Sequence, residues 1–143
     1  MIRNYTFWTK AFIATSILTA VIHSISLFVK PVATNDTEEQ LLQLMATYKM
    51  DAGAGFNPSM RDLFTALSSC FSLVYLLGAL VTWYLLRKKL NAEILKGIAG
   101  IQLIIYGISF VVMLVFTFLP PIVLTGLALI FVSLSYVSNR TAQ

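Results

Sequence analysis

The stretch IQLIIYGISFVVMLVFTFLPPIVLTGLALIFV, residues 101–132, contains no charged residue and is interrupted only by Pro120 and Pro121. A transmembrane helix needs about 20 predominantly apolar residues to cross the hydrocarbon core of a bilayer. Proline cannot continue a helix, but it fits the first turn of a new one. The stretch therefore predicts that one spanning helix ends at the two prolines and that the next begins with Pro121 in its first turn.

The rest of the chain has the same apolar character. Hydrophobic residues make up 58% of the 143 residues and charged residues 11%, whereas soluble domains have about 45–50% and about 25%. We therefore expect an all-α integral membrane protein with a single polytopic domain over residues 1–143. Four segments are long enough to span a bilayer: 11–29, 63–86, 94–119 and 122–137. Short connections make successive helices antiparallel neighbours, which predicts an antiparallel four-helix transmembrane bundle.

The basic residues predict an orientation. Of the ten Lys and Arg residues, three fall on one side of the predicted spans, namely Lys30, Lys49 and Arg61. The others fall on the side of the two termini: Arg3, Lys10, Arg87, Lys88, Lys89, Lys96 and Arg140. Because Lys and Arg concentrate in cytoplasmic loops, we expect both termini in the cytoplasm.

The long connection between the first two spans predicts a short amphipathic outer helix over residues 36–50. Either Asn35, or Asp36 with Glu39, has the chemistry to cap its start. Its apolar side chains fall on one stripe at helical spacing: Leu41, Leu44, Met45 and Tyr48. A helix this short and polar does not span a membrane. We expect it either on the membrane surface or over the mouth of the bundle.

The segment KMDAGAGFNPSMRDLF, residues 49–64, follows this predicted helix. Gly53 or Gly55 can adopt a positive φ and end the short helix. Asn57 or Ser59 can cap the next one, with Pro58 in its first turn, and Ser59 with Asp62 also has the spacing of a capping box. The glycines lack the spacing of a nucleotide-binding fingerprint, and no P-loop lysine follows them. We therefore interpret the segment as a joint between two helices.

Polar residues recur on the predicted spanning helices at similar depth. The chain has one histidine, His23, and polar groups that face lipid are costly. We expect a layer in the bundle interior formed by His23, Ser26, Ser68, Ser69, Ser72, Tyr106 and Ser109. Two interpretations remain open, namely hydrogen bonding between helices and a small ligand cavity. Asp51, Arg61 and Asp62 would lie at its outer rim, either as interfacial anchors or as contacts to an anion.

Several kinds of site lack the necessary residues. Cys70 is the only cysteine, which excludes an intramolecular disulfide and a thiolate metal cluster, and we expect its thiol to be buried and inert. A catalytic metal normally takes three protein ligands, so one histidine does not suffice. We expect no cofactor, no metal and no nucleic-acid partner. No predicted span holds the deep carboxylate that proton-coupled drug exporters of similar size require.

Three stretches carry a resemblance: LTAVIHSISLF, LLQLMATYKMDAGAGFNPSMRDLFTALSSCFSL and FTFLPPIVLTGLALIF. They resemble a group of small bacterial four-helix integral membrane proteins with no assigned activity. The resemblance implies four helices and a bacterial inner membrane, and it implies no catalytic residue.

Our leading functional hypothesis is a non-enzymatic membrane protein. It would act as an accessory subunit of a membrane-protein partner, or as a binder of a small lipophilic ligand beside His23. The alternative is a small homo-oligomeric transporter or channel-like protein. A third hypothesis, an intramembrane enzyme, would pair His23 with Ser68 or Ser69.

Overall fold

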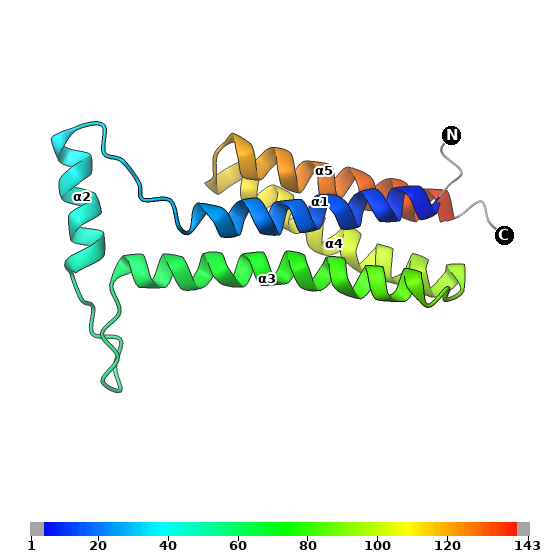
Figure 1. Cartoon of the computed structure of the whole chain (residues 1–143), viewed down its shortest axis with the longest axis horizontal. Coiled ribbons are helices and arrows are strands. Elements are labelled where there is room, and N and C mark those ends of the chain that lie inside the picture. Colours follow the sequence, from blue (N-terminus) through cyan, green and yellow to red (C-terminus); the bar gives the residue numbers. More distant parts are fainter. Residues whose placement is uncertain (1–4, 140–143) are drawn as a thin grey trace. The chain divides into compact units, whose positions relative to one another are not determined.

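The computed structural model describes residues 5–139, which form five helices in the order shown in Figure 1. Their bounds are α1 (Tyr5–Ser26), α2 (Asp36–Thr47), α3 (Met60–Arg87), α4 (Ala92–Phe116) and α5 (Leu119–Ser138). All except α2 are long and apolar enough to cross a membrane. The predicted all-α architecture is confirmed, with one short helix between the first two long ones. The chain is a multi-pass membrane protein.

The connection between α4 and α5 differs from the prediction. Helix α4 ends at Phe116, and the backbone N–H of Thr117 closes it by donating to the carbonyl of Met113. Helix α5 already begins at Leu119, so both prolines lie in its first turn. The first backbone N–H groups of a helix have no intrahelical acceptor, and proline, which lacks this group, loses nothing there. The prediction that the prolines end α4 is wrong, because α4 stops before them.

The described residues fall into two compact units. The first, which we call the bundle unit, consists of residues 5–20 and 74–139 and contains parts of all four long helices. The second, which we call the connecting unit, consists of residues 21–73. It includes the end of α1, the whole of α2 and the first half of α3, with α2 joined to its neighbours by two loops (Figure 1).

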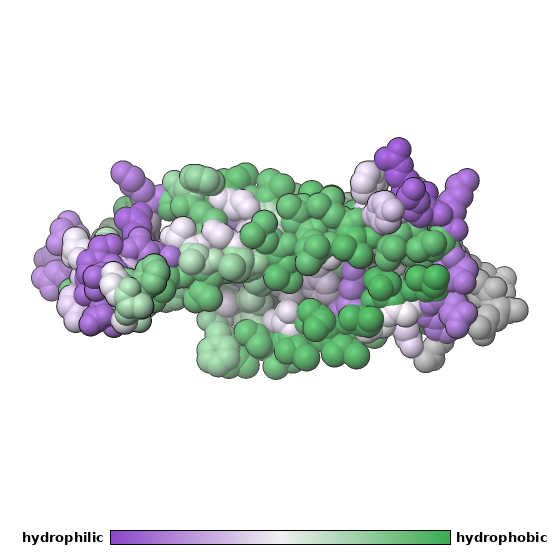
Figure 2. Space-filling view, turned by 90° about the horizontal axis from the view of Figure 1, so that it is seen from below, coloured by the Kyte–Doolittle hydropathy of each residue, from purple (hydrophilic) through white to green (hydrophobic). Residues whose placement is uncertain are grey.

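The bundle unit has a small aromatic core. The ring of Tyr106 in α4 meets Phe12 of α1 and Tyr75 of α3 edge to face, at centroid distances of 5.1 and 5.2 Å. Outward-facing side chains are large and apolar; Ile104, for example, is 64% exposed. Figure 2 shows such hydrophobic residues gathered over the surface of the long helices. An apolar exterior of this kind suits lipid rather than water.

Hydrogen bonds between helices hold the bundle unit together. The Tyr75 hydroxyl donates to Thr125 Oγ1 over 3.0 Å, which links α3 to α5. Gln102 Nε2 donates to Thr82 Oγ1 over 2.6 Å and links α4 to α3. A bond of 2.7 Å joins the hydroxyls of two further residues, Thr9 of α1 and Ser135 of α5. Polar links of this kind are typical of helix contacts inside membranes, where water does not compete for the groups.

The connecting unit confirms two of the predicted caps. Asn35 Oδ1 accepts the backbone N–H of Glu38 over 2.9 Å at the start of α2. At the start of α3, Ser59 and Asp62 form a reciprocal capping box, with side chain to backbone distances of 2.8 and 3.2 Å. Lys49 adds an ion pair of 2.8 Å to the Asp62 carboxylate.

The predicted role of the loop glycines is wrong. Helix α2 ends at Thr47, ahead of the glycines, and Tyr48 is its C-terminal cap. Gly53 and Gly55, with φ of 80° and 83°, instead lie at the tip of a hairpin that is closed by backbone hydrogen bonds further down. Their predicted positive φ is confirmed, and glycine adopts such values without steric cost. Because α2 has already ended at Thr47, they form a turn rather than a helix end.

Candidate functional site

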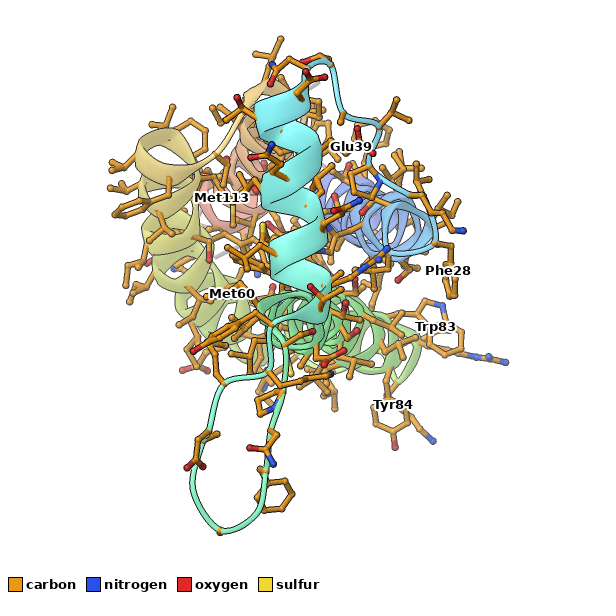
Figure 3. The ribbon with its side chains drawn as sticks, turned by 90° about the vertical axis from the view of Figure 1, so that its left-hand side faces the viewer. Phe28, Glu39, Met60, Trp83, Tyr84 and Met113 are labelled. Atoms are coloured by element: carbon orange, nitrogen blue, oxygen red, sulfur yellow. The ribbon has the colours of Figure 1, made fainter. Side chains whose placement is uncertain are left out.

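A pocket of about 690 Å³ lies within the connecting unit. It is bounded by the end of α1 and the chain that follows it, by one face of α2, and by the first turns of α3. Ligand pockets typically have volumes of about 300–1,000 Å³, so this one has room for one small molecule. Figure 3 looks onto α2, which lies across this end of the connecting unit.

Apolar side chains form much of the pocket lining, and they come from all three segments. They are Leu27 and Val29 after α1, Leu42, Met45 and Ala46 on α2, and Phe64 on α3. On α2, Leu42, Met45 and Ala46 are spaced i, i+3 and i+4 and therefore share one face of the helix.

This face of α2 is not the stripe that the sequence analysis selected. Leu41, Leu44 and Tyr48 are 54%, 59% and 62% exposed, and of the predicted stripe only Met45 lines the pocket. Helix α2 thus carries two apolar faces, one on the pocket and one exposed. Leu42, Met45 and Ala46 have the i, i+3, i+4 spacing of a helix face, but Leu41, Leu44 and Met45 have it too, so spacing alone did not separate the two faces.

Three charged side chains also line the pocket: Lys30, Glu39 and Arg61. Glu39 projects from α2 and is labelled in Figure 3. Phe28, which is also labelled there, is exposed and does not line the pocket. Among the described residues, neither the Lys30 ammonium nor the Arg61 guanidinium forms an ion pair or a side-chain hydrogen bond. Sequence analysis placed Arg61 at a rim and did not identify Lys30 or Glu39.

The two other predicted rim residues have partners in the backbone. Asp62 belongs to the α3 capping box and to the ion pair with Lys49, and Asp51 Oδ1 accepts the N–H of Gly53 over 2.8 Å in the hairpin. Neither lines the pocket. Their carboxylates therefore stabilise the loop and the helix start.

His23 lies one helical turn before the pocket-lining Leu27. Its ring meets Phe71 edge to face at 4.9 Å, and it is within hydrogen-bonding reach of the Ser68 carbonyl. The Nε2 atom of the His23 ring is buried and has no hydrogen-bond partner among the described residues. His23 itself is not among the side chains that line the pocket.

The serines of the predicted layer bond to their own helices. Ser26 donates to the His23 carbonyl over 2.6 Å, Ser69 to Thr65 over 2.8 Å and Ser72 to Ser68 over 3.4 Å. They therefore do not connect helices through these bonds. Ser26 and Ser68 line the pocket, whereas Ser69 and Ser72 do not.

The remaining predicted layer residues, Tyr106 and Ser109, belong to the bundle unit. Tyr106 is 5% exposed and is part of the aromatic core described above. The structure thus groups His23, Ser26, Ser68, Ser69 and Ser72 in the connecting unit.

The side chains of the site form neither a metal-ligand cluster nor a serine–histidine pair among the described residues. Within residues 5–139, no group of three or more His, Cys, Asp and Glu side chains is arranged to hold a metal ion. No serine hydroxyl in this range bonds to the His23 ring, as a nucleophile and its base would. Cys70 is exposed, contrary to the expected buried thiol, and it lies on the side of α3 that also exposes Leu67 and Leu73.

Comparison of the chain with protein-family models, with curated proteins and with solved structures gives no match, so no relative supplies a function.

Proposed function

We propose that this membrane protein is not an enzyme and that it binds a small lipophilic ligand in the pocket of the connecting unit. The observation that carries the proposal is the pocket lining. Apolar side chains from α2, α3 and the chain after α1 line an open pocket of about 690 Å³, with a few polar and charged groups among them. This combination of an apolar wall and a few polar groups is typical of small-molecule sites.

The unpaired Nε2 of His23 supports the same proposal. The nitrogen is buried next to a pocket-lining turn and has no partner in the described residues. A bound polar group, or a water that accompanies a ligand, would satisfy it.

The test is to fill the pocket and to measure ligand retention. The protein is extracted with its own lipids, and native mass spectrometry records the molecules that stay bound. Ala46→Trp inserts a large side chain into the pocket, whereas Leu41→Trp places the same side chain on the exposed face of the same helix. We expect a bound small molecule on the unmodified chain and on Leu41→Trp, and its loss from Ala46→Trp. Equal occupancy in both variants would refute the proposal.

We also propose that the protein lies in the inner membrane of a bacterium, with both termini in the cytoplasm. The excess of Lys and Arg on the side of the termini supports this orientation, although Arg3 and Arg140 lie outside the described residues. The pocket would then face away from the cytoplasm. A topology reporter fused after Gln143 should indicate a cytoplasmic C-terminus. A reporter signal from the external side would overturn this orientation.

A further inference from the structure

We propose that the ligand of this pocket is a single-chain amphiphile with an anionic headgroup, which Arg61 and Lys30 bind together. The inference rests on the proposed function and names the chemical class of the ligand. It starts from the charges in the pocket lining: two cationic side chains and one acidic side chain, Glu39.

Of the five acids of the connecting unit, three are already engaged; the other two are Asp36 and the pocket-lining Glu39. Asp62 binds Lys49 and the backbone of Ser59. Asp51 accepts the N–H of Gly53, and Glu38 accepts both the N–H and the hydroxyl of Thr34, over 2.7 and 2.6 Å. Lys49 therefore has a counter-ion, while Lys30 and Arg61 have none among the described residues. An anion is the ligand that complements this arrangement.

The two cations come from different segments. Lys30 follows α1 and Arg61 lies in the first turn of α3, yet both line the same pocket. A guanidinium binds a carboxylate or a phosphate with two parallel hydrogen bonds, and an ammonium adds a third donor from another direction. The two side chains could therefore hold one anionic headgroup between them.

The rest of the lining suits a hydrocarbon chain. Leu27, Leu42, Met45 and Phe64 contribute apolar surface in the same pocket as the cations. Met fits irregular and flexible ligands because its side chain is unbranched. The volume of about 690 Å³ is that of a site for one small molecule, which favours a single-chain amphiphile over a bulky two-chain lipid.

The experiment compares two probes that differ only in the headgroup. A long-chain fatty acid and the matching fatty alcohol, each with a diazirine on the chain, are photo-crosslinked to the full-length protein in uncharged detergent at neutral pH. Mass spectrometry of the digested protein maps the labelled residues. We expect both probes to label the pocket, with half-maximal labelling by the acid at a concentration about tenfold below that of the alcohol, as for one charge-assisted hydrogen-bonded contact.

Charge substitutions then assign the preference to individual side chains. Arg61→Gln and Lys30→Gln should each remove most of the preference for the acid and leave labelling by the alcohol unchanged. Lys88→Gln is the matched control, since it removes a cation that does not line this pocket. Glu39→Gln should strengthen labelling by the acid, because it removes the only acidic side chain of the lining. A purely structural role of Glu39 would not produce this gain.

The outcomes separate this inference from the proposed function. If acid and alcohol label the pocket equally, and if Glu39→Gln leaves the acid unaffected, the anionic headgroup is refuted while lipophilic binding stands. If neither probe labels the pocket, both proposals fall. If Arg61→Gln also abolishes labelling by the alcohol, that variant has disrupted the pocket, and the Glu39→Gln result decides.

Discussion

The close contact between α3 and α4 at Gly78 leads to a quantitative prediction for Gly78→Ala. A Cβ atom at this position would lie 3.0 Å from the Tyr106 hydroxyl oxygen, with the Tyr106 ring and the Gln102 amide also within reach, each at 4.0 Å. Tyr106 cannot easily move away. It is 5% exposed, and its ring is held between Phe12 and Tyr75 at 5.1 and 5.2 Å.

Two opposing effects determine the free energy of unfolding of this variant. Overpacking a well-filled core destabilises by about 1–3 kcal/mol. Replacing glycine by alanine in a helix interior stabilises by about 0.8–1 kcal/mol. The net expectation for Gly78→Ala is a loss of stability of up to about 2 kcal/mol.

Gly107→Ala is the matched control. It makes the same replacement inside α4, where an added Cβ would meet nothing within 4 Å. The helix-propensity effect is common to both variants, so their difference should equal the overpacking energy of about 1–3 kcal/mol. The assay is unfolding in mixed micelles with increasing SDS, followed by near-ultraviolet circular dichroism.

Removing the opposing oxygen completes the test. In a Tyr106→Phe background the hydroxyl is absent, so Gly78→Ala should lose most of its cost in a double-mutant cycle. The reasoning is refuted if Gly78→Ala is as stable as Gly107→Ala, or if the cost of Gly78→Ala persists fully when Tyr106 is phenylalanine.

Two further predictions concern the hydrogen bonds that the structure defines. Tyr75→Phe removes the buried bond to Thr125 and should cost about 0.6–1.7 kcal/mol in the same unfolding assay, as for other hydrogen bonds between membrane helices; no change would show that Thr125 finds another partner. At the start of α2, two hydrogen bonds from Thr34 lower the pKa of the Glu38 carboxyl; the bond from the hydroxyl has the larger effect and the bond from the backbone N–H the smaller. The stabilisation of α2 should therefore be present above the ordinary glutamate pKa, about 4.3, and should be lost as the pH falls through the lower pKa of the folded state. Amide hydrogen exchange of residues 36–47, corrected for intrinsic rates, measures this loss, and Glu38→Gln should abolish its pH dependence.

Much of the local structure could be predicted because it depends on neighbours in the sequence. The four spanning helices follow from runs of apolar residues of sufficient length. Asn35 caps α2 and Ser59 with Asp62 caps α3 because a cap needs only a side chain two or three residues from an unpaired N–H group. Pro121 was correctly assigned to the first turn of α5, but the end of α4 depends on the backbone around Thr117 and could not be derived from the prolines.

The candidate site was harder to predict, because its parts come from three segments. Arg61 was identified from the sequence, whereas Lys30 and Glu39 had no pattern that set them apart. Hydrogen bonds between helices were one of two interpretations of the serines near His23. A serine in a helix can also bond to a carbonyl one turn earlier, and Ser69 and Ser72 do so.

The sequence by itself determined that this is a multi-pass helical membrane protein, and it determined where α2 and α3 begin, because composition and caps act locally. Only the tertiary structure decided which side of each helix faces its neighbours. In a soluble protein the apolar face of a helix points inward. In a membrane protein lipid and core are both apolar, so the pattern does not distinguish them. For this reason the sequence did not show that Cys70 is exposed. It also did not show that Leu42 and Ala46, rather than Leu41 and Leu44, line the pocket.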